Sequence, residues 1–279
     1  MKNKAFLTVL ALLAAAAACS VKEDRTDCPC LLQVDLQHIL SSEPFRDMTS
    51  GMVSIDCICQ GKYIASDAYL IPTCPSIMEK TVPRSGVQLI GTILPEPRRI
   101  TEGKAFIALG QQADSLYACR AVVDTRGEEA RVELDLYKQF STVYISVIAT
   151  DTDGKAVSGA APDDLLFQAV GAVAGFDACS MEPLEGTFSY ELKDRTADGE
   201  LTFRMPRQKD AGIILKVKGS EDFSEEGITV PMGLYLERAG YDFNAAWLAD
   251  IHLQVNVSPT DITISVLDWE DAGRIDTDI

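Results

Sequence analysis

The sequence predicts an all-β protein in which sheets pack face to face in pairs. Apolar and polar residues alternate strictly in many segments, turn-forming residues interrupt these segments, and no long helical stripe of apolar residues occurs. Alternation with a period of two gives a strand one buried and one solvated face. Repeated at short intervals, such strands are typical of sandwich folds. The segments are 32–37, 132–136, 143–147, 188–192, 201–205, 213–217, 252–257 and 262–266.

The chain begins with the features of an exported protein. Two lysines precede a short apolar run over residues 6–18, which ends in small residues before Cys19. The run is too short to span a bilayer, so we expect residues 1–18 to be a signal peptide. The ending resembles a bacterial lipobox, with Ala16 in place of the usual Leu, in which the sulfur of Cys19 is diacylated after cleavage. A plain secretory signal with an incidental cysteine is the alternative.

Residues 19–27 are expected to form a lipid-anchored tether. The charged residues directly after Cys19 resemble the surface-export signal of lipoproteins in Bacteroides-type bacteria; they are Lys22, Glu23 and Asp24. A solvated tether without such a signal would also be charged, so this is the alternative. Acyl chains alone can hold a protein on a membrane. We therefore expect a lipoprotein of the cell outer membrane that is exposed at the surface.

The chain is strongly acidic. Its formal net charge is −17, and removal of residues 1–18 takes away two lysines and no acid, which leaves −19. A chain with this charge repels phosphate backbones, so we expect no nucleic-acid partner.

Two domains are expected, because the residues left after cleavage are more than one ordinary domain needs. The boundary fits best near residues 137–140, where one set of strand-like segments closes and another opens. No linker rich in Pro or Gly lies there. We expect closely apposed domains over residues 28–138 and 139–279.

Two segments of the second domain have ambiguous patterns. Residues 151–154 begin like a calcium loop, but Lys155 and Pro162 occupy later ligand positions, so the Asp-Gly pair favours a tight hairpin turn. Residues 163–174 have a composition that suits a short helix. Gly171 and the strand-rich surroundings favour a strand with a bulge instead.

The cysteines are not arranged as a metal site. With Cys19 consumed by lipid, an odd number remains, so at least one thiol stays unpaired within the chain. Cys28 and Cys30, like Cys57 and Cys59, are separated by one residue, which is closer than zinc ligands usually lie. Residues two apart in a strand share a face. We expect buried thiols or cross-strand disulfides here. The other cysteines are Cys74, Cys119 and Cys179.

No pattern indicates catalysis. The histidines are His38 and His252, and both are predicted on the polar side of a strand. A hydrolytic triad needs a nucleophile, a base and an acid brought together. The sequence contains no nucleophile elbow, zinc-binding helix, phosphate loop or dinucleotide fingerprint. We expect no catalytic residue, no cofactor and no metal.

One tripeptide suggests a modification. Asp114-Ser115-Leu116 looks like the sequence at which Bacteroides-type bacteria attach O-glycans. Three residues also occur together by chance, so both interpretations stay open.

The layout of the chain resembles a known family. The lipobox is followed by Asp27-Cys28-Pro29, which runs directly into a strand-like segment at 31–37. Two β-domains follow, and the last alternating segment ends in Trp269. These features resemble the fimbrial anchor (minor fimbrium subunit) lipoproteins of Bacteroidales.

The resemblance implies two transthyretin-like β-sandwich domains in tandem and a role at the base of a pilus. In such fimbriae, subunits join by strand exchange, in which a strand of one chain completes the open sheet edge of its neighbour. The resemblance makes Cys19 the membrane attachment and residues 28–37 the retained first strand. Residues 261–279 become the segment that engages a fimbrial stalk or adaptor subunit. The acidic residues after Trp269 are poorly suited to an apolar groove, which is a departure from the family's pattern for an exchanged strand.

A surface glycan-binding lipoprotein or adhesin built from β-sandwich domains is the alternative. It would share the lipid, the sandwiches and the lack of catalysis. It should also present an exposed aromatic platform, for which Trp247 and Trp269 are the tryptophan candidates. An envelope hydrolase is a third possibility, which the scarcity of histidine disfavours.

Overall fold

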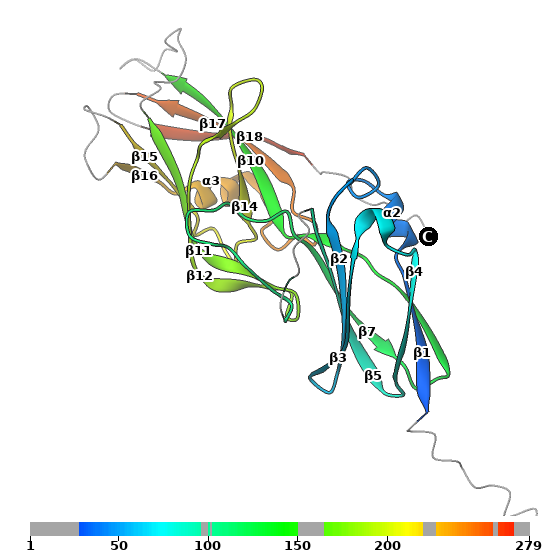
Figure 1. Ribbon diagram of the computed structural model, residues 1–279. Coiled ribbons are helices and arrows are strands. Elements are labelled where there is room, and N and C mark those ends of the chain that lie inside the picture. The colour runs from blue at the N-terminus through cyan, green and yellow to red at the C-terminus, as the bar shows by residue number, and fades with distance from the viewer. Residues whose placement is uncertain are drawn as a thin grey trace, which may run out of the picture.

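The structure is a computed structural model that describes residues 28–95, 100, 102–149, 165–219, 227–258 and 262–270. Strands dominate these ranges, and the expected all-β class is confirmed. Figure 1 shows the strands gathered into two stacks of sheets that lie end to end. The helical elements of the described part are α2 (Gln37–Ser41), α3 (Met232–Ala239) and the 3₁₀ turn η1 (Ile71–Thr73).

The first sandwich consists of a three-stranded sheet and a five-stranded sheet. The smaller sheet has the order β4-β1-β8, and the larger has the order β3-β2-β5-β7-β9. Their strands are β1 (Pro29–Asp35), β2 (Met52–Cys59), β3 (Lys62–Leu70), β4 (Ile77–Pro83), β5 (Gly86–Leu94), β7 (Tyr117–Asp124), β8 (Glu129–Glu133) and β9 (Tyr137–Lys138).

The alternating pattern decides which side chains fill this sandwich. Cys30, Leu32 and Val34 of β1 have no exposed surface, whereas Leu31 and Gln33 between them are partly exposed. The buried side chains pack with inward residues of the larger sheet in one apolar cluster. The predicted inward face of the first strand is therefore confirmed.

The second sandwich consists of two larger sheets. One has the order β13-β14-β10-β17-β18, and the other has the order β12-β11-β15-β16, with β6 added along β11. Their strands are β6 (Lys104–Phe106), β10 (Phe140–Ala149), β11 (Leu166–Asp177), β12 (Glu182–Glu191), β13 (Asp194–Arg195), β14 (Leu201–Pro206), β15 (Ile214–Lys218), β16 (Ile228–Val230), β17 (Asp250–Val257) and β18 (Ile262–Glu270).

The two sandwiches meet through the main chain and through one shared sheet. The chain leaves the first sandwich at Lys138 and enters the second at Phe140. In addition, β6 lies within residues 28–138 but pairs with Gly175–Asp177 at the end of β11. A small apolar cluster that includes Ile90 and Phe176 fills the space beside this pairing. The domain bounds 28–138 and 139–279 stay a prediction, since neither half is tested alone.

The structure confirms some of the local expectations and contradicts others. The bulge in 163–174 is confirmed, because the pairing of β11 with β12 shifts register around Gly171 and Val173. The first strand ends at Asp35, earlier than expected, because Gln37–Ser41 turn into α2. The helix α3 was not predicted, although Gly240 ends it in the left-handed conformation with φ of 97°. The expected turn at 151–154 lies outside the described residues.

Candidate functional site

The first strand of the described chain occupies the centre of its sheet. It pairs antiparallel with β4 over Pro29–Asp35 and parallel with β8 over residues 31–35. Both edges of β1 are thus paired, and its inward side chains are fully buried. A segment held in this way leaves its sheet only if two hydrogen-bond ladders and a set of core contacts break together.

Polar side chains on the outer face add cross-strand contacts to β1. The Nε2 atom of Gln33 donates a hydrogen bond to Glu79 on β4 at 2.9 Å. Arg131 on β8 forms an ion pair with Asp35. The backbone N–H of Gln37 and then the Arg131 guanidinium hold the pKa of Asp35 below its usual range. These contacts connect β1 to both of its neighbours.

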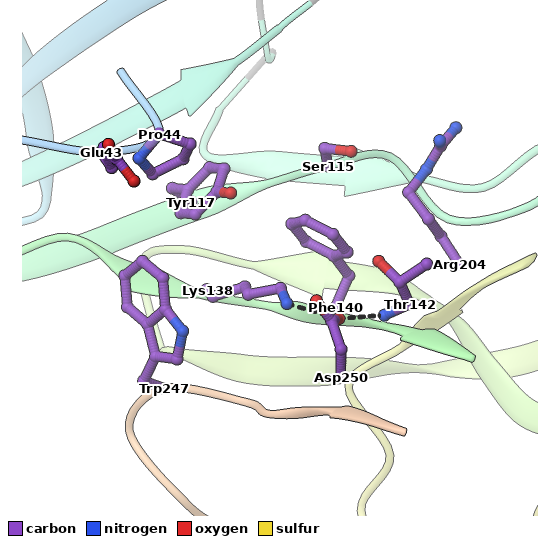
Figure 2. Close-up of a pocket in the computed structure, with 10 residues that line it drawn as sticks. All are labelled: Glu43, Pro44, Ser115, Tyr117, Lys138, Phe140, Thr142, Arg204, Trp247 and Asp250. Carbon is purple, nitrogen blue, oxygen red and sulfur yellow. Dashed lines mark hydrogen bonds and ion pairs between the residues drawn. The ribbon is translucent and has the colours of Figure 1, made fainter. Parts of the chain in front are cut away.

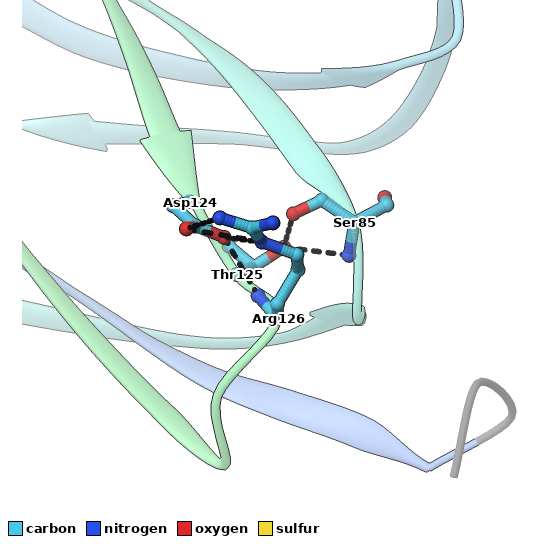
Figure 3. Close-up of polar contacts among 4 residues, drawn as sticks. All are labelled: Ser85, Asp124, Thr125 and Arg126. Atoms are coloured by element: carbon cyan, nitrogen blue, oxygen red, sulfur yellow. Dashed lines mark hydrogen bonds and ion pairs between the residues drawn. The ribbon is translucent and has the colours of Figure 1, made fainter. Parts of the chain in front are cut away.

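A buried threonine braces the loops beside the start of β1. Thr125 has no exposed surface, and its Oγ1 lies 2.7 Å from the carbonyl oxygen of Pro83 and 2.8 Å from that of Ser85. The N–H of Ser85 donates to the same Oγ1 at 3.2 Å. Figure 3 shows Thr125 between Ser85 and an outer pair formed by Asp124 and Arg126. The hydroxyl thus ties the β4–β5 turn to the end of β7.

An ion pair between Asp124 and Arg126 lies beside Thr125 at the end of β7. The Arg126 guanidinium and backbone N–H donate to the Asp124 carboxylate at 2.6–3.1 Å. These hydrogen bonds lower the pKa of Asp124 to about 2. Close by, the N–H of Leu31 donates to the carbonyl oxygen of Glu128 at 2.8 Å, which connects the start of β1 to the residue before β8.

A pocket of about 450 Å³ lies where the two sandwiches meet. Figure 2 shows Trp247 at one end of it and Arg204 at the other, with Tyr117 and Phe140 between them. Residues from both sandwiches form its walls. The lining residues are Glu43, Pro44, Ser115, Tyr117, Lys138, Phe140, Thr142, Arg204, Trp247 and Asp250.

Aromatic rings form one wall of the pocket around Tyr117. Its ring centre lies 4.7 Å from that of Phe45 and 5.6 Å from those of Phe140 and Trp247. Tyr117 and Phe140 are each 5% exposed, whereas Trp247 keeps more of its surface in contact with solvent. Burial raises the pKa of Tyr117 above its usual range, so its hydroxyl stays protonated at physiological pH.

An ion pair forms the floor of the pocket. Lys138, which is 3% exposed, places its Nζ 2.6 Å from Oδ1 of Asp250 and 4.8 Å from the centre of the Phe140 ring. The same oxygen of Asp250 accepts a hydrogen bond from the backbone N–H of Thr142 at 2.5 Å. The pair therefore joins β9 of the first sandwich to β10 and β17 of the second.

Arg207 holds the loop that carries Trp247 against the same junction. Its Nε donates to Oε1 of Gln139 at 2.6 Å, and its Nη atoms donate to the carbonyl oxygens of Phe243 and Ala245 at 3.1 and 2.8 Å. Burial lowers the pKa of Arg207 from its usual value. Because these acceptors lie on separate segments, the guanidinium fixes the position of the Trp247 loop relative to residues 138–139.

The last described strand differs from the first. Within the described part of the chain, β18 pairs with β17 alone and forms an edge of its sheet. Ile262 and Ile264 are buried, whereas Thr263, Ser265 and Leu267 face solvent. The acidic tail after Glu270 and the side chain of Trp269 lie outside the described residues.

The two histidines lie on different elements, His38 in α2 and His252 in β17. His252 lies on the outer face of β17 as expected and stacks on Tyr144 with ring centres 4.7 Å apart. The expectation for His38 was wrong, because this residue belongs to the helix α2 and its Nε2 is buried. Neither residue lines the pocket at the junction.

The cysteines of the described part are free thiols. Cys30, Cys57 and Cys119 are buried in the core of the first sandwich, and Cys59 lies near its margin. Burial raises the pKa of Cys57 to about 11 and that of Cys119 to about 12. The expectation of buried thiols is thus confirmed for Cys30, Cys57 and Cys59 and wrong for Cys28, which is exposed; Cys19 lies outside the described residues.

The tripeptide at 114–116 lies beside the pocket. Ser115 is partly buried and lines the pocket, and Leu116 is 3% exposed. The contribution of Lys138, Arg204 and Asp250 to the same pocket has no local signal in the sequence. Among the described residues, no three side chains of His, Cys, Asp or Glu gather as metal ligands would. No described helix has the length and apolar character needed to cross a membrane.

The fold occurs in solved structures from Bacteroidales. A candidate polysaccharide-binding protein of Bacteroides thetaiotaomicron matches with a TM-score of 0.57 at 12% identity, covering 88% of this chain and 100% of that one. A candidate adhesin of the same species matches with a TM-score of 0.54 at 12% identity, covering 87% and 97%. The fimbrial anchor protein Mfa2 of Porphyromonas gingivalis matches with a TM-score of 0.51 at 11% identity, covering 87% and 97%.

At these identities the likeness establishes the fold. The match extends over both sandwiches and nearly the whole of each similar chain. No model of a protein family matches the sequence. No curated protein is significantly similar to it either.

Proposed function

We propose that this chain, which has the fold of the fimbrial anchor and adhesin structures, is a non-catalytic lipoprotein that anchors a fimbrium at the outer membrane. The observation that carries the proposal is the position of β1, which follows the predicted lipid tether directly and is paired along both edges. The similarity in fold to a fimbrial anchor protein, over 87% of this chain and 97% of that one, supports the same role. The partner would be a fimbrial stalk or adaptor subunit.

The geometry of β1 suits a strand that transmits force. A lipid on Cys19 would apply load to the start of β1 through residues 20–28. A pull along the strand axis loads the hydrogen bonds to β4 and β8 together, because these bonds run across the strands. The bracing by Thr125 keeps the neighbouring turns in place at the end where this load enters.

The junction between the sandwiches would pass this load onward. Lys138 and Asp250 join the two halves by a nearly buried ion pair, and Arg207 fixes residues 138–139 to a loop of the second half. The pairing of β6 with β11 makes a second connection. We propose that domains 28–138 and 139–279 act as one mechanical unit for this reason.

Engagement of the next subunit would use the other end of the chain. The strand β18 has one edge without a strand partner in the described part, and backbone groups on such an edge accept an added strand. We propose that residues 261–279 take part in strand exchange with a stalk subunit. The acidic tail favours a partner groove that carries positive charge at its exit.

The anchor role is tested by substituting two nearby cysteines in cells of the source organism. Cys19→Ala should release the protein from the outer-membrane fraction and free the fibres into the medium. Cys28→Ala is the matched control, since Cys28 is exposed and lies just before β1. It should leave protein and fibres in the membrane fraction. Equal retention of both variants would contradict the proposal.

A surface adhesin without a pilus is the second candidate. The observation that favours it is the similarity in fold to an adhesin and a polysaccharide-binding protein. Purification of the native protein separates the two. The anchor should co-purify with a fibrous polymer of a different subunit, whereas a self-contained adhesin should purify alone.

A further inference from the structure

We propose that the pocket at the junction of the two sandwiches binds an uncharged saccharide residue against Trp247. The inference goes beyond the anchoring role, because it assigns a ligand site that anchoring does not need. Its first basis is size and shape. The volume of about 450 Å³ falls within the range of small-molecule sites, and such sites combine apolar walls with a few placed polar groups.

The charges of the pocket favour a neutral ligand. Lys138 and Arg204 contribute two positive charges, and Glu43 and Asp250 contribute two negative ones, so the lining carries no net charge. The positive charge of Lys138 is already compensated by Asp250 at 2.6 Å. An anionic ligand would also approach a chain with a net charge of −17 against repulsion.

The polar groups suit a ligand with many hydroxyls. Ser115 and Thr142 offer hydroxyl groups, which donate and accept. Arg204 donates through its Nε to the carbonyl oxygen of Ala113 at 2.7 Å, and the described residues provide no hydrogen-bond acceptor for its terminal nitrogens. A sugar presents hydroxyls that can donate to one of these groups and accept from another.

Trp247 supplies the aromatic surface and an unpaired donor. Its indole N–H is buried and has no hydrogen-bond partner among the described residues. In Figure 2 this nitrogen lies on the side of the ring that faces Lys138 and Asp250. A buried donor without a partner destabilises the unliganded state, so a ligand oxygen that accepts from it would be favoured. A small turn of the ring would bring the N–H to a ligand oxygen, while the ring face covers the apolar C–H side of the sugar.

The loop that carries Trp247 is held in place without a ligand. Arg207 fixes the loop before Trp247 through the carbonyl oxygens of Phe243 and Ala245, and Tyr117 packs against the indole at 5.6 Å between ring centres. Preorganisation of this kind lowers the entropic cost of binding. The pocket therefore combines a loop that is already in place with one buried N–H that has no partner among the described residues.

The experiment uses the full mature chain in detergent and a panel of galactose, glucose, mannose, N-acetylglucosamine and their disaccharides. Ligand-observed saturation-transfer NMR and tryptophan fluorescence titrations measure binding, and glucuronic acid serves as the charged probe. At least one uncharged sugar should bind and quench the fluorescence. Binding of glucuronic acid alone, or of no sugar, would overturn the proposal.

Three variants locate the site. Trp247→Ala should weaken binding of the sugar at least about tenfold. Ser115→Leu should do the same by filling the pocket, while it keeps Trp247 and the urea midpoint. Phe106→Ala is the matched control, because Phe106 is an exposed aromatic residue, 61% exposed, that does not line the pocket. Equal binding in all three variants, or a loss in Phe106→Ala alone, would contradict the assignment.

The test of saccharide binding does not depend on whether the protein anchors a fimbrium. Cys19→Ala should leave the sugar affinity unchanged, and failure of the panel would leave the retention of the lipoprotein unaffected. Quenching of Trp247 by a purified fimbrial subunit, with no response to any sugar, would overturn the saccharide assignment in favour of a protein ligand.

Discussion

The strands at the two ends of the described chain differ in how they are held. β1 lies in the middle of its sheet, with β4 on one side and β8 on the other. β18 lies at the edge of its sheet and pairs with β17. The inward residues of β1 have no exposed surface, whereas in β18 Ile262 and Ile264 are each 5% exposed and Val266 is only partly buried.

Under the proposed function, this difference would give the two ends separate roles. A strand paired on both sides cannot be exchanged without unfolding the core around it, so the N-terminal end is suited to permanent attachment. An edge strand presents unpaired backbone groups and is suited to a partner. If the proposal holds, the contrast would allow one fold to be fixed at one end and extended at the other.

The largest expected effect comes from placing a charge in each strand. Leu32→Asp puts a carboxylate into a core position without exposed surface, which should destabilise the protein by about 5 kcal/mol or more. Thr263→Asp places the same charge on the exposed face of β18 and should change stability by less than about 0.5 kcal/mol. Urea unfolding followed by circular dichroism measures both. Equal stability of the two variants would show that the core around β1 is no less tolerant of charge than the exposed face of β18.

The second effect concerns the junction that connects the two ends. Asp250→Ala leaves Lys138 buried without its partner, so it should cost about 3–5 kcal/mol. Lys209→Ala is the control, because its ion pair with Glu185 is exposed to solvent and should leave the unfolding midpoint unchanged. Calorimetry of the full chain should also show whether the two sandwiches then unfold separately. A single unfolding transition with an unchanged midpoint for Asp250→Ala would show that the Lys138–Asp250 pair does not stabilise the junction.

A smaller effect is expected at the bracing near the start of β1. Thr125→Val keeps the shape of the side chain but removes the hydroxyl shared by the carbonyl oxygens of Pro83 and Ser85. The loss should be about 1–3 kcal/mol. Thr263→Val on the exposed face of β18 is the matched substitution and should have almost no effect. Equal unfolding midpoints for the two variants would show that the brace does not contribute to stability.

The smallest perturbation is chemical labelling, which leaves the fold intact. Only the thiolate reacts with iodoacetamide, and burial raises the pKa of Cys119 to about 12, so this group stays protonated at pH 8. Cys28 is exposed and should be alkylated within minutes. Mass spectrometry of native protein should find Cys119 and Cys57 unlabelled until urea is added. Rapid labelling of Cys119 would mean that the first sandwich opens more readily than the position of β1 implies.

Much of the strand pattern could be predicted from sequence. Alternation depends on neighbouring residues, so the inward faces of β1, β14 and β17 follow directly from residues 32–37, 201–205 and 252–257. The helix α3 was missed because one apolar face over eight residues is a weak signal among strands, although Pro231 and Gly240 mark its ends. His38 was misplaced because the pattern did not show that β1 ends at Asp35.

The junction could not be predicted in the same way. The pocket brings together Glu43, Tyr117, Lys138, Arg204 and Trp247, which are far apart in the sequence and carry no shared local motif. Likewise, the parallel pairing of β1 with β8 depends on how the whole sandwich closes. Both features depend on which segments meet in the folded chain. An alternating pattern within one segment does not identify the segment against which it packs.

The attachment of the first strand is tested most directly by the mass of the mature N-terminus. The measurement uses protein purified together with its fibres from the outer membrane. We predict a polypeptide that begins at diacylated Cys19 and still contains residues 29–35. A mature chain that begins beyond residue 35, or an unmodified Cys19, would contradict the account.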